Sequence, residues 1–99
     1  MARFDVYAEP GGFGFLLDCQ ADLLNGLSTR LMVPLMPRPE APIAGARLNP
    51  IFRVEGVEVA MVTQFAGAVP IRDLGERVMS LADEQPRIMN ALDMLITGY

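Results

Sequence analysis

Residues 49–64, NPIFRVEGVEVAMVTQ, constrain the fold more than any other part of the chain. Two apolar-rich runs flank Glu55-Gly56, a two-residue turn of the kind that joins antiparallel strands. Because side chains alternate along a strand, pairing Val54 with Val57 gathers five apolar side chains on one face: Phe52, Val54, Val57, Val59 and Met61. A β-hairpin with one apolar face is therefore predicted, and the rest of the fold must cover that face.

Four further strands or extended segments are predicted, at residues 4–7, 13–20, 31–36 and 69–71. The second alternates, so that one face carries Phe13, Phe15, Leu17 and Cys19. Asp18 falls on the other face and is expected to be exposed. Pro34 has no N–H to donate, which favours an edge strand or a bulge for residues 31–36. The proline-rich residues 37–47 are predicted to be a loop.

The C-terminal residues have helical spacing. Asp83 is the predicted N-cap, and Pro86 suits the first turn because its missing N–H would have no helical partner there. An apolar stripe predicted to pack on the sheet consists of Ile88, Ala91, Leu92, Leu95 and Ile96. Met94 lies on the opposite face, and Gly98 is suited to end the helix in a left-handed conformation. Short antiparallel strands followed by one helix indicate a small barrel or sheet closed by that helix, in a single domain of residues 1–99.

Apolar residues also crowd a segment that should be solvated. Leu23, Leu24 and Leu27 surround the turn signal Asn25-Gly26, so something is expected to cover them. The chain is 52% apolar with a mean hydropathy of +0.30, which is more than a modest core of this size needs. Some apolar surface is therefore expected to serve a partner.

Composition excludes several kinds of chemistry. The net charge of −4 and eight scattered basic residues, all arginine, argue against direct nucleic-acid binding. The chain has no histidine, which excludes histidine-dependent triads and histidine metal sites, and no metal or other cofactor is expected. Cys19 is predicted to be a buried, inert thiol. Ser28-Thr29-Arg30 is more simply a turn than a hydroxyl–cation site. An interaction protein is thus favoured over an enzyme.

The expected location is the cytoplasm. No apolar stretch approaches the ~18 residues of a membrane-spanning helix, and the N-terminal residues have neither the apolar region nor the cleavage site of a signal peptide. A single cysteine suits a reducing compartment.

Six blocks in order carry a resemblance to a known family: FDVY, LDCQADLL, TRLMVPL, MVTQFAGAVP, LGERV and IMNALDMLITGY. Over nearly its whole length the chain resembles CcdB, the toxin of a toxin–antitoxin pair. The resemblance implies an α+β, mainly β fold: an SH3-like barrel of about five antiparallel strands, a small extra sheet and one C-terminal helix. It also implies a homodimer with Met94 and Leu95 in the dimer interface.

The resemblance implies two further partners and no catalysis by the toxin. Family members bind the A subunit of DNA gyrase and trap the enzyme on cleaved DNA, and the disordered C-terminal segment of a cognate antitoxin reverses this. Carried over by position, the gyrase-binding residues are Leu23, Leu24, Asp93, Ile96, Thr97, Gly98 and Tyr99. A wedge of this kind is expected to need a free C-terminus beyond Gly98.

The tip departs from the family pattern, which ends in Trp-Gly-Ile. Here Thr97 replaces the tryptophan, Gly98 is kept and Tyr99 replaces the isoleucine. Two alternatives therefore stay open. One is a protein of this fold that binds an antitoxin, as a decoy or in autoregulation of an operon, without poisoning gyrase. The other is an endoribonuclease toxin using a site around Arg30.

Overall fold

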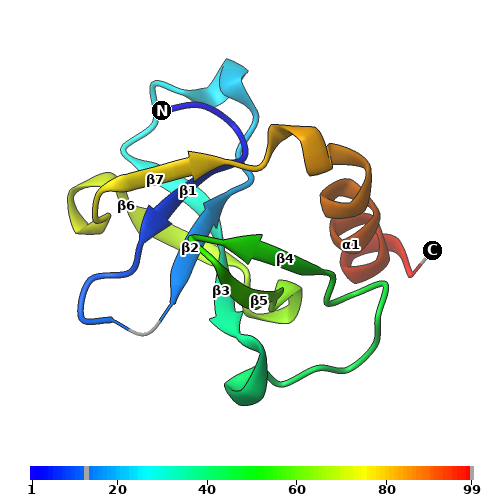
Figure 1. The fold of residues 1–99 in the computed structure, drawn as a ribbon. Coiled ribbons are helices and arrows are strands. Elements are labelled where there is room, and N and C mark those ends of the chain that lie inside the picture. The colour runs from blue at the N-terminus through cyan, green and yellow to red at the C-terminus, as the bar shows by residue number, and fades with distance from the viewer. Residues whose placement is uncertain (13, 99) are drawn as a thin grey trace.

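A computed structural model describes residues 1–12 and 14–98, and shows a curled β-sheet with a helix beside it (Figure 1). The strands are β1 (Asp5–Ala8), β2 (Phe15–Asp18), β3 (Thr29–Pro37), β4 (Ile51–Val54), β5 (Val57–Met61), β6 (Gly67–Pro70) and β7 (Arg77–Ser80). The helix is α1 (Gln85–Thr97). Five short 3₁₀ turns complete the described elements: η1 (Asp22–Leu24), η2 (Arg38–Glu40), η3 (Thr63–Phe65), η4 (Ile71–Asp73) and η5 (Ala82–Glu84).

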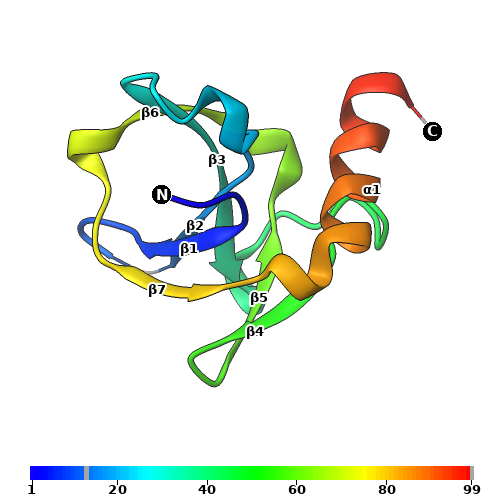
Figure 2. The same cartoon turned by 90° about the horizontal axis from the view of Figure 1, so that it is seen from above.

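The described strands form one antiparallel sheet in the order β4-β5-β3-β2-β1-β7, and β6 pairs with the first half of β3. Seen from above, β7, β1, β2, β3 and β6 curl into a ring, and the β4–β5 hairpin extends from it beneath α1 (Figure 2). This half-barrel with a C-terminal helix confirms the predicted mainly β fold. Among the described residues the ring accounts for about five strands, as expected, and the β4–β5 hairpin, joined to the ring through β3, adds two more to the same sheet.

The predicted hairpin is confirmed in its register. Val54 pairs with Val57, and the turn residues Glu55 and Gly56 have φ angles of 50° and 79°. Positive φ at both central residues is the geometry that matches the twist of the flanking strands. The apolar face is buried except at Val57, beside the turn.

The edge position predicted for Pro34 is wrong. β3 lies inside the sheet, paired with β2 on one side and with β6 and then β5 on the other. The Pro34 carbonyl accepts a hydrogen bond from the Val62 N–H at 2.8 Å, so the proline nitrogen faces this second side. Pairing with β6 ends at Met32 and pairing with β5 begins at Leu35, so Pro34 lies where β3 changes partners and removes no ladder bond.

The exposure predicted for Asp18 is also wrong, because both faces of the curled sheet are covered. One face packs with α1 and the hairpin around Val6, Leu17 and Ile88. The other face bears polar side chains that are nevertheless buried, among them Asp18 and Arg30. Alternation along β2 was predicted correctly, but the second face is covered rather than exposed to solvent. Phe13, assigned to the apolar face, lies outside the described residues.

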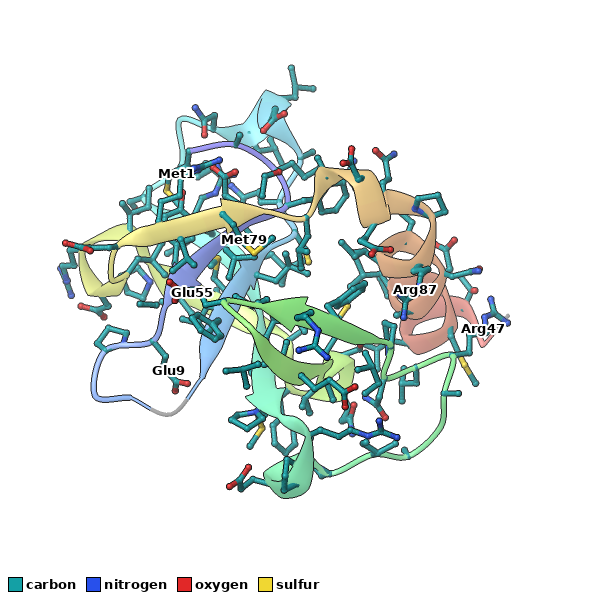
Figure 3. All side chains as sticks on the ribbon, in the orientation of Figure 1. Met1, Glu9, Arg47, Glu55, Met79 and Arg87 are labelled. Atoms are coloured by element: carbon teal, nitrogen blue, oxygen red, sulfur yellow. The ribbon has the colours of Figure 1, made fainter. Side chains whose placement is uncertain are left out.

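The helix begins later than predicted and its end projects past the sheet. Residues 82–84 form η5, and Glu84 rather than Asp83 occupies the N-cap position of α1. Arg87 fixes the first turns to the hairpin: its guanidinium lies 4.6 Å from the Phe52 ring and donates to the Ile51 carbonyl at 2.8 Å (Figure 3). Ile88, Ala91 and Leu92 are buried as predicted, but Leu95 and Ile96 are exposed.

Two other local features differ from the sequence prediction. Residues 77–80 form β7, an unpredicted strand, and the strand expected at residues 69–71 lies at Gly67–Pro70. The loop predicted at residues 37–47 is confirmed apart from the single turn η2, although β3 includes Pro37. Among the residues described, no helix is long and apolar enough to cross a membrane.

Candidate partner-binding face

The last turns of α1 display apolar side chains that the sheet does not cover. Ile96 is 76% exposed, and Met94 and Leu95 are exposed as well. Gly98 has a φ angle of 81° and donates its N–H to the Met94 carbonyl at 3.0 Å, which confirms the predicted left-handed cap. The Thr97 hydroxyl donates to the Asp93 carbonyl at 2.7 Å. The exposed end is therefore a regular, capped helix, and Tyr99 lies outside the described residues.

A second exposed apolar group lies in η1 and the turn after it. Leu23 is 94% exposed, and Leu24 and Leu27 are also exposed. Every residue from 21 to 28 is solvent-accessible, so this chain does not supply the cover that the sequence led us to expect. Exposed leucines grouped in this way are typical of a surface that a partner covers.

The two regions share an edge in the view of Figure 2, whereas Figure 1 shows η1 at the top of the molecule and the end of α1 at its right. Arg3 connects η1 to the helix, because its N–H donates to the Asp22 carboxylate at 2.8 Å and its Nη2 lies 3.0 Å from the Met89 sulfur. Exposed Phe65 of η3, a turn that packs against α1, adds a further apolar side chain. We call η1 (Asp22–Leu24), Asp93 and residues 96–98 together the partner-binding face.

A buried ion pair lies beneath η1. Arg30 donates from Nε and Nη2 to Asp18 Oδ2 at 3.0 and 2.6 Å, and both side chains have an exposure of 0%. The third guanidinium nitrogen, Nη1, donates to the Asn25 side-chain oxygen at 2.7 Å. Arg30 is therefore shielded from solvent and engaged at all three nitrogens, which removes it as the exposed cation of a ribonuclease site.

The thiol is inert, as the sequence predicted. Cys19 is buried, and this burial raises its pKa from 9.0 to about 12, with a smaller contribution from the Asp18 carboxylate. A thiol with this pKa stays protonated near neutral pH and is a poor nucleophile. Within residues 1–12 and 14–98, no cluster of acidic, cysteine or histidine side chains has the arrangement of a metal site.

The structure places the described residues carried over from the family pattern in two exposed segments, η1 and the end of α1. Leu23, Leu24, Asp93, Ile96, Thr97 and Gly98 all lie on the partner-binding face, and each of them is exposed. Sequence reasoning missed the contacts that Arg3, Asp18 and Asn25 make around η1. A charged residue within each of two apolar strands, Asp18 and Arg30, was the available signal, since buried charges are usually paired.

The fold and the sequence were each compared with known proteins. The toxin MazF-mt6 of Mycobacterium tuberculosis has a similar structure, with a TM-score of 0.72 over 92% of this chain and 93% of that one. The two sequences are 14% identical, so this likeness concerns the fold. The family model described as CcdB protein matches residues 3–98, nearly the entire chain. The chain therefore belongs to the CcdB family, whose members are toxins of toxin–antitoxin systems.

Proposed function

We propose that this protein is a toxin that binds the A subunit of DNA gyrase through the partner-binding face and traps gyrase on cleaved DNA. One observation supports this above the others: Leu23 and Ile96, at positions that the family resemblance assigns to gyrase, are 94% and 76% exposed. Exposed apolar side chains on two ordered elements are suited to bury area against another protein at little ordering cost.

The proposed mechanism requires binding and no chemistry by the toxin. The exposed ends present leucine and isoleucine side chains, and the thiol is buried and protonated. A wedge that stabilises the cleaved state of gyrase acts by binding that state more tightly than the resealed one. Because the target is gyrase, we propose that the protein acts in the cytoplasm and contacts no membrane.

The same face suits the second proposed partner, a cognate antitoxin. A disordered segment that folds on binding needs a large apolar surface to offset its ordering cost. The leucines of η1 and the exposed end of α1 provide such surface. We propose that antitoxin binding and gyrase binding exclude one another.

We also propose that two copies associate through the exposed face of α1. Met94 and Leu95 are exposed in a single chain although both are apolar. A two-fold axis beside the helix would let these residues pack against their counterparts in a second copy. Sedimentation of the wild-type protein beside a Met94→Asp variant tests this, and a monomeric wild type at micromolar concentration would contradict it.

A gyrase cleavage assay tests the central proposal. Purified protein is incubated with gyrase and supercoiled DNA, and covalently trapped linear DNA is measured after denaturation. We expect trapping by the wild type and a loss of trapping with Leu23→Asp or Ile96→Asp. Ile43→Asp is the matched control, since Ile43 is an exposed isoleucine outside the face. Absence of trapping by a folded wild-type protein would overturn the proposal.

The altered tip supports one alternative function. Thr97 stands where the family has tryptophan, and an interface tryptophan commonly contributes about 2 kcal/mol or more. A protein of this family that binds an antitoxin without poisoning gyrase would bind the antitoxin peptide tightly yet give no trapped DNA. Thr97→Trp would then introduce gyrase binding, and calorimetry with both partners distinguishes the two functions.

A further inference from the structure

η1 adopts a regular turn although none of its side chains is buried. Its leucines point away from the core, and residues 21–28 are all exposed, so apolar burial does not hold this segment in place. Three backbone hydrogen bonds shape the turn, with Leu24, Asn25 and Leu27 as donors. Bonds of this kind open readily in an exposed segment unless other contacts restrain it.

The restraints are polar, and they come from three residues outside η1: Arg3, Gln20, which follows β2, and Arg30 of β3. The Arg3 N–H donates to the Asp22 carboxylate at 2.8 Å. Gln20 donates from Nε2 to the Leu24 carbonyl at 2.9 Å, and its Oε1 accepts from the Leu31 N–H at 3.1 Å. From below, Arg30 Nη1 donates to the Asn25 side-chain oxygen at 2.7 Å. Gln20 and Arg30 thus connect the turn to residues whose own positions are fixed by the sheet.

Arg30 is suited to this task because its guanidinium is planar and its nitrogens have fixed relative directions. Two nitrogens bind Asp18 Oδ2, and the other carboxylate oxygen accepts from the Gln20 N–H at 3.0 Å. The carboxylate therefore orients the guanidinium, and the guanidinium orients Asn25. A lysine has one nitrogen and could not hold Asp18 and Asn25 in this forked arrangement.

We propose that Arg30, oriented by Asp18, is a positioning residue that holds Leu23 and Leu24 in their binding conformation through the Asn25 side chain. The identity of the partner rests on the proposed function, whereas the positioning itself does not. A buried ion pair is weak evidence for stability, since apolar replacements are often equally stable. A role in ordering η1 also explains why the third guanidinium nitrogen, Nη1, donates to the Asn25 side chain.

Asn25→Ala tests the proposal while leaving Arg30 and Asp18 themselves in place, since it removes only the hydrogen bond from Arg30 Nη1 to Asn25. Asn25 has ordinary right-handed angles, φ −64° and ψ −16°, so alanine fits its backbone. We expect amide exchange of Leu24, Asn25 and Leu27 to accelerate about tenfold or more, since a hydrogen bond to a charged group is lost. Asn25→Asp keeps an oxygen for Arg30 and should keep the wild-type exchange rates. Asn90→Ala, on an exposed part of α1, is the matched control for an asparagine side chain.

Binding to the purified gyrase A subunit supplies the second readout. We expect Asn25→Ala to weaken binding about tenfold, and to have no further effect when Leu23 and Leu24 are already alanine. If the effect of Asn25→Ala requires the two leucines, Asn25 acts by positioning them. If it does not, Asn25 contacts gyrase directly. Arg30→Lys should loosen η1 in the same way, while its charge still pairs with Asp18.

Different results would overturn the two proposals. Unchanged exchange of the three amides in Asn25→Ala would overturn the positioning role, whether or not gyrase binds. The same holds if Asn25→Ala weakens binding equally in the presence and absence of the leucines. A wild-type protein that does not bind gyrase contradicts the proposed function, and the exchange experiment then decides the positioning role.

Discussion

The two parts of the partner-binding face expose apolar side chains by different means. The end of α1 continues a stripe whose first half is buried, so Ile88 and Leu92 fix the direction in which Ile96 projects. η1 has no buried residue of its own and depends on Asp18, Asn25 and Arg30. Apolar packing thus positions one half of the face and a buried polar network positions the other. Each half should therefore fail under a different kind of substitution.

The largest effect is expected from Arg30→Ala. Removing one member of a buried ion pair leaves Asp18 unpaired, which typically costs about 3–5 kcal/mol of unfolding free energy. Urea denaturation measures the loss, and Arg53→Ala, at an exposed position of β4, is the control. A loss below about 1 kcal/mol would show that the pair is dispensable for stability.

The next largest effect on the unfolding free energy is expected in the buried first half of α1, and little effect is expected at its exposed end. Ile88→Ala removes a fully buried side chain and should cost about 3 kcal/mol, whereas Ile96→Ala should change the unfolding free energy by less than about 0.5 kcal/mol. Thermal or urea unfolding of both variants gives the comparison. Equal losses at the two positions would mean that Ile96 is covered in solution by packing that a single chain does not show.

A smaller effect is expected at Thr97, where a substitution should strengthen gyrase binding. Thr97→Trp restores the aromatic residue of the family pattern and should strengthen binding to the gyrase A subunit by about 2 kcal/mol, roughly 30-fold. Isothermal calorimetry measures the change. Unchanged or weaker binding would indicate that the tip of this protein meets its partner differently from the family pattern.

The smallest effect concerns pH. The pKa of Cys19 is raised from 9.0 to about 12, so the unfolded chain loses this proton at lower pH than the folded one. The associated stability is fully present below about pH 9 and is lost as the pH rises towards about 12. The unfolding free energy should therefore fall less steeply between about pH 8 and pH 11 in Cys19→Ala than in the wild type. If the unfolding free energy falls equally steeply with pH in both proteins, the raised pKa of Cys19 is contradicted.

The sequence predicted features that depend on local pattern and missed those that depend on distant strands. The Glu55-Gly56 hairpin, the buried residues Ile88 and Leu92, and the Gly98 cap all follow from short-range periodicity and turn chemistry. The burial of Asp18 could not be predicted this way, because it requires the sheet to curl until its second face is covered. Pro34 likewise required knowledge of where β3 exchanges β6 for β5.

The candidate site also combines residues that the sequence located with contacts that only the structure shows. Family resemblance assigned Leu23, Leu24 and Ile96 to a partner, and the structure shows all three exposed. It did not reveal that Leu95 and Ile96 leave the buried stripe, since helical spacing alone cannot tell where the sheet ends. Nor did it reveal the contact between Arg30 and Asn25, five positions apart across a turn.

Hydrogen-exchange footprinting of the complex with the gyrase A subunit tests most directly whether the two parts act as one face. We expect protection in residues 22–27 and 93–98 together, with no change at the turn residues Glu55 and Gly56 of the hairpin. Protection confined to one of the two parts, or centred on the hairpin, would contradict the partner-binding face as the gyrase site.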